Sequence, residues 1–268
     1  IEALERSRQE MSYIDVIKDK ARMDRRTIVL PETTDKRTLI AASHIIQEGI
    51  ANIIMIGDPE KIMDGATWLE IDLEGVKIVN PLHCDKLDEY VNLLYETRKN
   101  KGMTLEKARD ILLSDPLTFG VIMVKANDAD GMVAGACHAT ADTLRPALQI
   151  LKTAPGVKLV SGFFLMCIPD CEFGENGTFL FADCGLNQDP TAEELAAIAD
   201  TSSRSFKYDL PPRCRVPWIL QHWEPMPHRA AVLRQWSGED ITHGQFSLPP
   251  PPYLPAHALH FPWWSGLT

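Results

Sequence analysis

The sequence predicts a two-domain α/β protein whose sheets are mostly parallel. From residue 12 to residue 208, short apolar runs that are typical of buried strands alternate with longer amphipathic segments that are typical of helices. The length of 268 residues is compatible with two domains of ordinary size, and no internal repeat indicates another architecture.

The first half of the chain shows strand and helix signals in alternation. Its strand candidates are apolar runs such as "TIVLP" and "NIIMIG", which end at Pro or Gly. Its helix candidates carry apolar residues every three or four positions, and one of them ends in a basic turn followed by Gly, "RKNKG". We expect strands at residues 27–31, 52–57 and 76–81, and helices at 35–50, 84–102 and 104–114.

The alternation continues in the second half as far as residue 206. The apolar runs "FGVIMVKA", "VKLVSGFFLMCIP" and "TFLFADCG" predict strands, and "TLRPALQILK" and "TAEELAAIADTSSRSF" have helical periodicity. We expect strands at 119–126, 157–169 and 178–185, and helices at 143–152 and 191–206.

The composition changes abruptly near Leu210. Eleven of the 19 prolines and five of the six tryptophans follow it, and the last lysine is Lys207. One interpretation is a Pro-rich docking arm, because PxxP segments bind aromatic grooves; the other, which we favour, is a segment foreign to this fold, such as an out-of-frame end. We therefore expect a non-native leader at 1–11, a first α/β domain at 12–155, an incomplete second α/β domain at 156–208 and a non-native tail at 209–268.

Charge and hydropathy argue against two classes of partner. The net charge of −10 disfavours nucleic-acid binding, and no apolar run reaches the roughly 18 residues of a membrane span. The charged N-terminal segment lacks the apolar centre of a secretory signal, so we expect a cytoplasmic protein without membrane or nucleic-acid partners. Its six cysteines are then expected to be reduced thiols.

The segment 130–150, "DGMVAGACHATADTLRPALQI", is the leading candidate for a binding site. Gly135 allows close approach of a ligand to the backbone, and Thr143 is one of several candidate N-caps for the helix that follows. Arg145 falls in the first turn of that helix, where its charge opposes the helix dipole. Its role is either to bind an anion such as phosphate or to pair with a nearby carboxylate such as Asp142.

Two further arginines are weaker candidates for the same cleft. Arg37 follows the strand at 27–31 and opens a helix, and Arg98 lies in the basic run "YETRKNKG". Each also has an ordinary explanation, since Arg37 fits a solvated surface position and a cation at a helix C-terminus is favoured by the dipole.

Metal and nucleotide motifs do not fit the sequence. The segment "NDADG" at 127–131 resembles part of a calcium loop, but the twelfth position is Cys137 rather than Glu. No G-x-G-x-x-G or Walker A motif is present. We expect no metal site, because zinc spacing is absent from the candidate ligands His138, Cys167, Cys171 and Cys184.

Taken together, the segments resemble the phosphate acetyltransferase (phosphotransacetylase) family. "PETTDKRTLIAA", "LLYETRKNKGMTLEKARDIL", "DADGMVAG", "TADTLRPALQILKT" and "PDCEFGENGTFLFADCGLNQDPTAEELAAIA" look like signatures of this family and occur in its order, from about residue 12 to residue 207. The resemblance implies interconversion of acetyl-CoA and phosphate with acetyl phosphate and CoA. It also implies two three-layer αβα domains like those of isocitrate and isopropylmalate dehydrogenases, with the active site between them.

The resemblance also implies roles for single residues. Arg37 looks like the family arginine of the CoA and phosphate region, Arg98 like a second active-site arginine, and Arg145 like the one that holds the phosphate of acetyl phosphate. Thr143 and Gly135 belong to the same substrate-binding region, and Cys171 matches a cysteine near the site that is not a nucleophile. CoA enters as a substrate, so no cofactor and no metal are expected, and a homo-oligomer is expected as in the family.

One departure from the family pattern concerns the catalytic base. The family carries a Ser and an Asp, thought to orient and deprotonate the CoA thiol, in a later "STKGSA"-like loop and a C-terminal segment, and neither is readable in 209–268. If a base lies within 12–207, the nearest candidates are Asp142, Asp170 and Asp183. The alternatives to an acetyltransferase are a phosphate butyryltransferase and an inactive or regulatory acyl-phosphate-binding fragment.

Overall fold

The computed structural model describes most of the chain between residues 13 and 220. The described residues are 13–157, 159–168, 171, 177–183, 186–187, 189–209 and 218–220.

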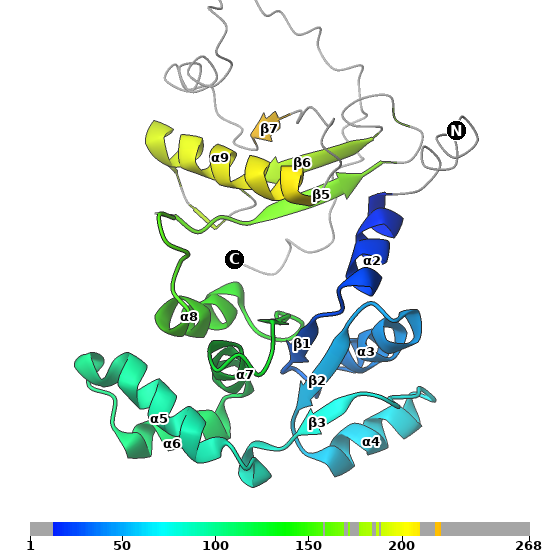
Figure 1. Ribbon diagram of the computed structural model, residues 1–268, viewed down its shortest axis with the longest axis vertical. Coiled ribbons are helices and arrows are strands. Elements are labelled where there is room, and N and C mark those ends of the chain that lie inside the picture. Colours follow the sequence, from blue (N-terminus) through cyan, green and yellow to red (C-terminus); the bar gives the residue numbers. More distant parts are fainter. Residues whose placement is uncertain are drawn as a thin grey trace, which may run out of the picture. The chain divides into compact units, whose positions relative to one another are not determined.

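Four parallel strands form the first sheet (Figure 1). They are β1 (Thr27–Leu30), β2 (Asn52–Ile56), β3 (Lys77–Val79) and β4 (Gly131–Met132), in the order β3-β2-β1-β4. The chain therefore runs outward from β1 to β3 and then returns to the other side of β1. Ligands of open α/β sheets bind beyond the carboxyl ends of the strands at such a reversal, here between β1 and β4.

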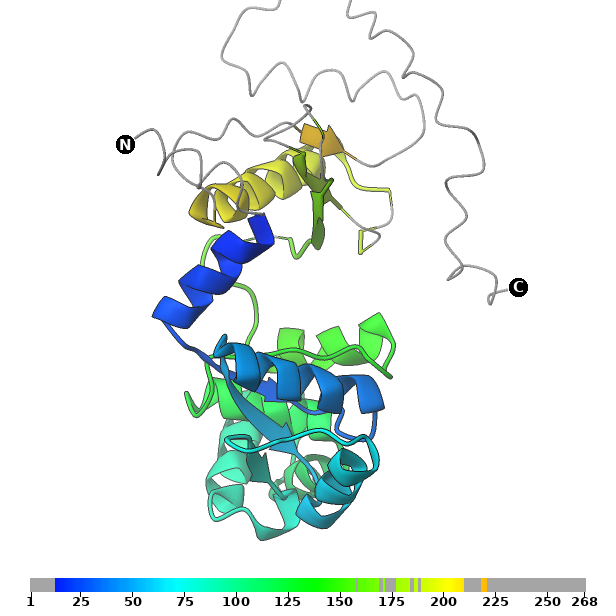
Figure 2. The same cartoon turned by 90° about the vertical axis from the view of Figure 1, so that its right-hand side faces the viewer.

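Each face of this sheet is covered by helices (Figures 1 and 2). Successive residues of a strand point to opposite faces, so Ile53 and Met55 pack under α3 (Lys36–Glu48) and α4 (Pro59–Trp68). Ile54 and Ile56 pack in a second core cluster on the other face. That cluster is built by α5 (Leu87–Arg98), α6 (Leu105–Ser114), α7 (Pro116–Lys125) and α8 (Thr140–Ile150).

The prediction of a strand at 119–126 is wrong, because these residues belong to α7. Residues 117–123 of this helix are all buried, so the helix is apolar on every side and shows no amphipathic period. An apolar run of this kind cannot be distinguished from a buried strand by periodicity alone. Its start is nevertheless marked in the sequence, since Pro116 occupies the first turn and the Asp115 carboxylate accepts the Leu117 N–H at 3.0 Å.

The other helices and strands that we predicted before residue 119 are confirmed, with shorter bounds. The α3 helix begins at its cap Asp35 and ends at Gly49, whose φ of +66° is a left-handed conformation. The basic run after α5 closes with a 3₁₀ turn at Lys99–Lys101 and with Gly102 at φ +79°. The sequence analysis did not assign α2 (Tyr13–Met23), α4, the 3₁₀ turn Pro81–His83 and the two-residue strand β4.

The second sheet has three strands, β5 (Phe163–Cys167), β6 (Thr178–Ala182) and β7 (Trp218–Leu220). The β5–β6 pair is antiparallel and the β6–β7 pair is parallel. β7 and the last residue of the helix that ends at Asp209 lie inside the segment 209–268 that we expected to be foreign to the fold, and residues 210–217 and 221–268 lie outside the described residues.

The last described helix is α9 (Ala192–Asp209). Its start is a capping box, in which the Thr191 N–H donates to Glu194 Oε2 at 2.8 Å and the Glu194 N–H donates to Thr191 Oγ1 at 3.3 Å. Among the described residues, none of the helices has the length and the apolar character needed to cross a bilayer.

Candidate functional site

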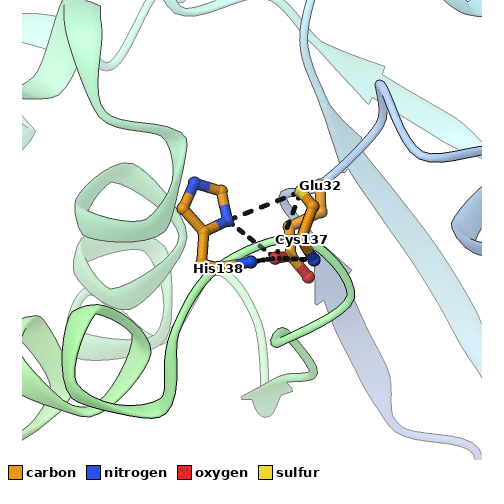
Figure 3. Close-up of side chains that lie close together, drawn as sticks. All are labelled: Glu32, Cys137 and His138. Atoms are coloured by element: carbon orange, nitrogen blue, oxygen red, sulfur yellow. Dashed lines mark hydrogen bonds and ion pairs between the residues drawn. The ribbon is translucent and has the colours of Figure 1, made fainter. Parts of the chain in front are cut away.

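The carboxylate of Glu32 organises the loop that follows β4 (Figure 3). Glu32 comes just after β1 and accepts the backbone N–H groups of Gly135, Ala136, Cys137 and His138 at 2.7, 2.7, 2.9 and 3.1 Å. Gly135 has a φ of +110°, which other residues rarely adopt. The adjacency of β1 and β4 thus brings a buried carboxylate under four consecutive amides.

Glu32 is ionised in this setting although only 3% of it is exposed. Burial raises the pKa of its carboxyl group, but the hydrogen bonds from the Cys137 amide, the His138 ring and the Ala136 and Gly135 amides outweigh burial and lower the pKa to about 2. The charge of Glu32 is therefore part of the fold at neutral pH.

Arg37 attaches this loop to the start of α3. Its side chain pairs with the cap Asp35, with Nε–Oδ1 at 3.0 Å and Nη2–Oδ2 at 2.6 Å, and also donates to the carbonyl oxygen of Ala136. The hydrogen bonds that the Arg37 side chain and backbone donate lower the pKa of the Asp35 carboxyl group to about 2. Arg37 thus serves the loop and its cap, and it does not line the cavity described next.

An open cavity of about 320 Å³ is lined mainly by residues of helices α5 to α8. Arg98 from the end of α5 and Arg145 from α8 both line it, as does His138 from the loop that Glu32 holds. The structure therefore brings together two of the three arginines that the sequence analysis selected. The cavity is lined by Leu94, Arg98, Met103, Ile111, Asp115, Leu117, Thr118, His138, Asp142, Arg145, Pro146, Gln149 and Ile150.

The charges around this cavity are only partly compensated. Arg145 pairs with Asp142 at 3.3 Å, but the two side chains are 62% and 52% exposed, and such a surface pair is worth little. Asp115 is occupied at the cap of α7, where it also accepts the Thr118 hydroxyl at 2.5 Å. The Arg98 side chain forms no hydrogen bond or ion pair with any residue in the described part of the chain.

The first turn of α8 has no side-chain cap, and Arg145, which we expected in this turn, lies in the second turn because the helix already begins at Thr140. The N-cap of this helix is Ala139, which offers no side-chain acceptor to the free N–H groups there. Thr143, which we considered as a cap, instead lies in the first turn and donates its hydroxyl to the Ala139 carbonyl at 3.3 Å.

The remaining residues selected from the sequence lie elsewhere or serve the fold. Cys171 is half-buried beside Gly177, where an added Cβ would lie 3.2 Å from the Cys171 Cβ. Asp183 is buried and accepts the Leu186 and Asn187 N–H groups at 3.2 and 2.8 Å, which is a turn-forming role. Asp170 lies outside the described residues.

Glu32, Cys137 and His138 form a cluster that the sequence analysis missed (Figure 3). His138 Nδ1 lies 2.7 Å and Cys137 Sγ lies 3.5 Å from Glu32 Oε1, and the sulfur is 3.6 Å from Nδ1. These are the residues in the described part of the chain whose ligand atoms lie close enough together to hold a metal ion. The adjacent Cys137 and His138 are visible in the sequence, but the sequence analysis combined His138 with the later cysteines. Glu32 could not be added, because the pairing of β1 with β4 was not recognised.

Comparison with known proteins identifies relatives of this chain. Residues 12–216 match the family described as "Phosphate acetyl/butaryl transferase". The chain is 55% identical over 197 residues to a phosphate acetyltransferase of Acetivibrio thermocellus, covering 74% of this chain and 58% of the relative. It is 52% identical to the phosphate acetyltransferase of Thermoanaerobacterium thermosaccharolyticum, with 74% and 59% covered.

Solved structures show the same relationship. A phosphotransacetylase from Streptococcus pyogenes matches with a TM-score of 0.66 at 40% identity, over 74% of this chain and 59% of that one. The EutD phosphotransacetylase from Staphylococcus aureus matches with a TM-score of 0.66 at 38% identity, over 74% and 57%. The chain thus spans less than two thirds of the length of the relatives it matches.

Proposed function

The chain belongs to the phosphate acetyl/butaryl transferase family, and we propose on this premise that it acts in the interconversion of acetyl-CoA and phosphate with acetyl phosphate and CoA. The observation that carries the proposal is the convergence of Arg98 and Arg145 on one cavity that residues of α5 to α8 line. Phosphate and acetyl phosphate are the oxyanions for which such a cavity is suited.

An entering phosphate group would compete with Asp142 for Arg145. The existing pair is half exposed and is worth about 0–1 kcal/mol, whereas a hydrogen bond to a charged group contributes about 1.5–3 kcal/mol. Arg98 would add a second cation without breaking an ion pair among the described residues. The anion therefore wins this competition, and both arginines would stabilise the phosphate as it leaves or attacks the acetyl group.

The thiol side of the reaction needs a group that these residues do not supply. A thiol with a pKa near 8.5 is mostly protonated at neutral pH, so attack on the acetyl carbonyl requires a base. Asp183 is occupied by two backbone amides, and the Asp142 carboxylate has, among the described residues, no contact that marks it as a base other than its exposed pair with Arg145. We therefore assign the phosphate-binding half of the reaction to the described residues, with CoA as a substrate and no cofactor.

The proposal is tested by isothermal titration calorimetry of the 268-residue chain with inorganic phosphate and with acetyl phosphate, which measures the affinity for each. Arg98→Ala should weaken the binding of both at least tenfold, because one charge-assisted contact is lost. Arg109→Ala is the matched control, since Arg109 pairs with Asp88 and does not line this cavity. Equal affinities of the unchanged chain and Arg98→Ala would contradict the assignment.

The acyl group is the finer part of the proposal. The family description covers acetyl and butyryl transfer, and relatives named as acetyltransferases at 55% and 52% identity favour acetyl. An acyl-phosphate-binding role without turnover is the second candidate, because the described residues supply two arginines for the phosphate. Homo-oligomer formation and a cytoplasmic location stay predictions.

A further inference from the structure

We propose that Glu32, Cys137 and His138 form a binding site for one divalent transition-metal ion of the zinc type. The three side chains supply a carboxylate, a thiolate and an imidazole, all of which are ligands that zinc accepts. The inference concerns metal binding and its test needs no acyl transfer, although His138 also lines the cavity of the proposed function.

The spacing of the three ligand atoms agrees with tetrahedral coordination. Bonds of about 2.3 Å to sulfur and about 2.0–2.1 Å to nitrogen and oxygen place a sulfur about 3.5 Å from either other ligand atom. The observed separations from Cys137 Sγ are 3.6 Å to His138 Nδ1 and 3.5 Å to Glu32 Oε1. Only the Nδ1–Oε1 distance of 2.7 Å must widen, by about 0.6–0.7 Å, and the His138 ring is exposed enough to turn.

The metal ion would replace the hydrogen bonds that now join these groups. Glu32 Oε1 is the shared acceptor facing the thiol and the His138 ring, and its four backbone amides would continue to orient it. Binding releases the thiol proton to solvent, and the proton that Nδ1 of His138 donates to Glu32 exchanges through solvent to Nε2, so that the neutral ring coordinates through Nδ1. The Glu32 carboxylate and the Cys137 thiolate together balance the charge of a divalent ion.

Two features of the surroundings bear on affinity. The positive charge of Arg37, which lies beside the loop, opposes the binding of a metal cation. This charge is already compensated by the ion pair with Asp35. Burial, and then the hydrogen bond to Glu32, raises the pKa of the Cys137 thiol, so metal must compete with a bound proton. The site has three protein ligands, and its exposed side at Cys137 and His138 leaves the fourth position to water.

The test is a titration of the whole chain with Co²⁺, whose thiolate complexes absorb by sulfur-to-metal charge transfer. One equivalent should produce this absorption, and added Zn²⁺ should remove it by displacement. Cys137→Ser should abolish the absorption, and His138→Gln should weaken Co²⁺ binding at least tenfold. Cys84→Ser is the control, because Cys84 lies outside the cluster and should leave the titration unchanged.

The variants decide the outcome because the chain contains five further cysteines. Cys137 and His138 are exposed, and far-UV circular dichroism checks that both variants keep their helix content. Absence of the absorption in the unchanged chain would overturn the proposal. So would absorption that survives Cys137→Ser or is lost in Cys84→Ser.

Discussion

The two sheets use similar apolar strands in different ways. β2, "NIIMI", is buried at four of its five residues between two layers of helices. β5, "FFLMC", is equally apolar, yet Phe163, Phe164 and Met166 are exposed. An apolar run therefore identifies a strand but does not establish that both of its faces are covered, and the candidate site is built on the sheet whose faces are covered.

The largest effect is expected in the core of the first sheet. Phe119 is fully buried in α7 and meets the Tyr90 ring edge-on at a centroid distance of 5.4 Å. Phe119→Ala should lower the free energy of unfolding by about 3–5 kcal/mol, because it removes buried surface and leaves a cavity. Urea denaturation followed by circular dichroism measures this loss. Phe119→Leu is the milder control, and equal stability of all three chains would show that α7 is not a core helix.

The second effect separates the charge of Glu32 from its packing. The folded-state pKa of Glu32 is about 2 and its ordinary value is 4.5, so the charged form stabilises the fold above the ordinary value. This contribution, about 3 kcal/mol, is lost as the pH falls from about 4.5 towards 2. Glu32→Gln should be less stable at neutral pH and should lack this part of the pH dependence. Parallel stability–pH curves for the two chains would contradict the prediction.

These two positions show what the sequence could and could not predict. Elements with a clear period, such as α3 and α6, were predicted because an amphipathic helix records its buried face in its sequence. The α7 helix was not, because a helix buried on every side leaves no period. Glu32 was missed for another reason: its partners lie more than a hundred residues away, and only the pairing of β1 with β4 brings them together.

Two substitutions at the cavity that Arg98 and Arg145 line should change the affinity for acetyl phosphate in opposite directions. Arg145→Ala should weaken acetyl phosphate binding by about 1.5–3 kcal/mol, because one charge-assisted contact is lost. Asp142→Asn should tighten binding up to about fivefold, because Arg145 no longer has to leave an ion pair worth at most about 1 kcal/mol. Isothermal titration checks both, with Arg204→Ala on α9 as the control, because Arg204 pairs with Asp200 and does not line the cavity. Asp142→Asn binding more weakly than the unchanged chain would refute the competition.

The smallest effect on stability is expected at β5, where the two sheets differ most. Phe164 lies opposite Phe181 in the β5–β6 ladder but is 60% exposed. Its replacement therefore removes little buried apolar surface. Phe164→Ser should change the free energy of unfolding by about 0.5 kcal/mol or less, in contrast to Phe119→Ala. Because an exposed apolar strand favours association, the same change should raise the concentration at which the chain begins to aggregate. Light scattering and denaturation on the same samples measure the two quantities. A loss of several kcal/mol would show that this face of β5 is covered in solution, and the contrast between the two sheets would then disappear.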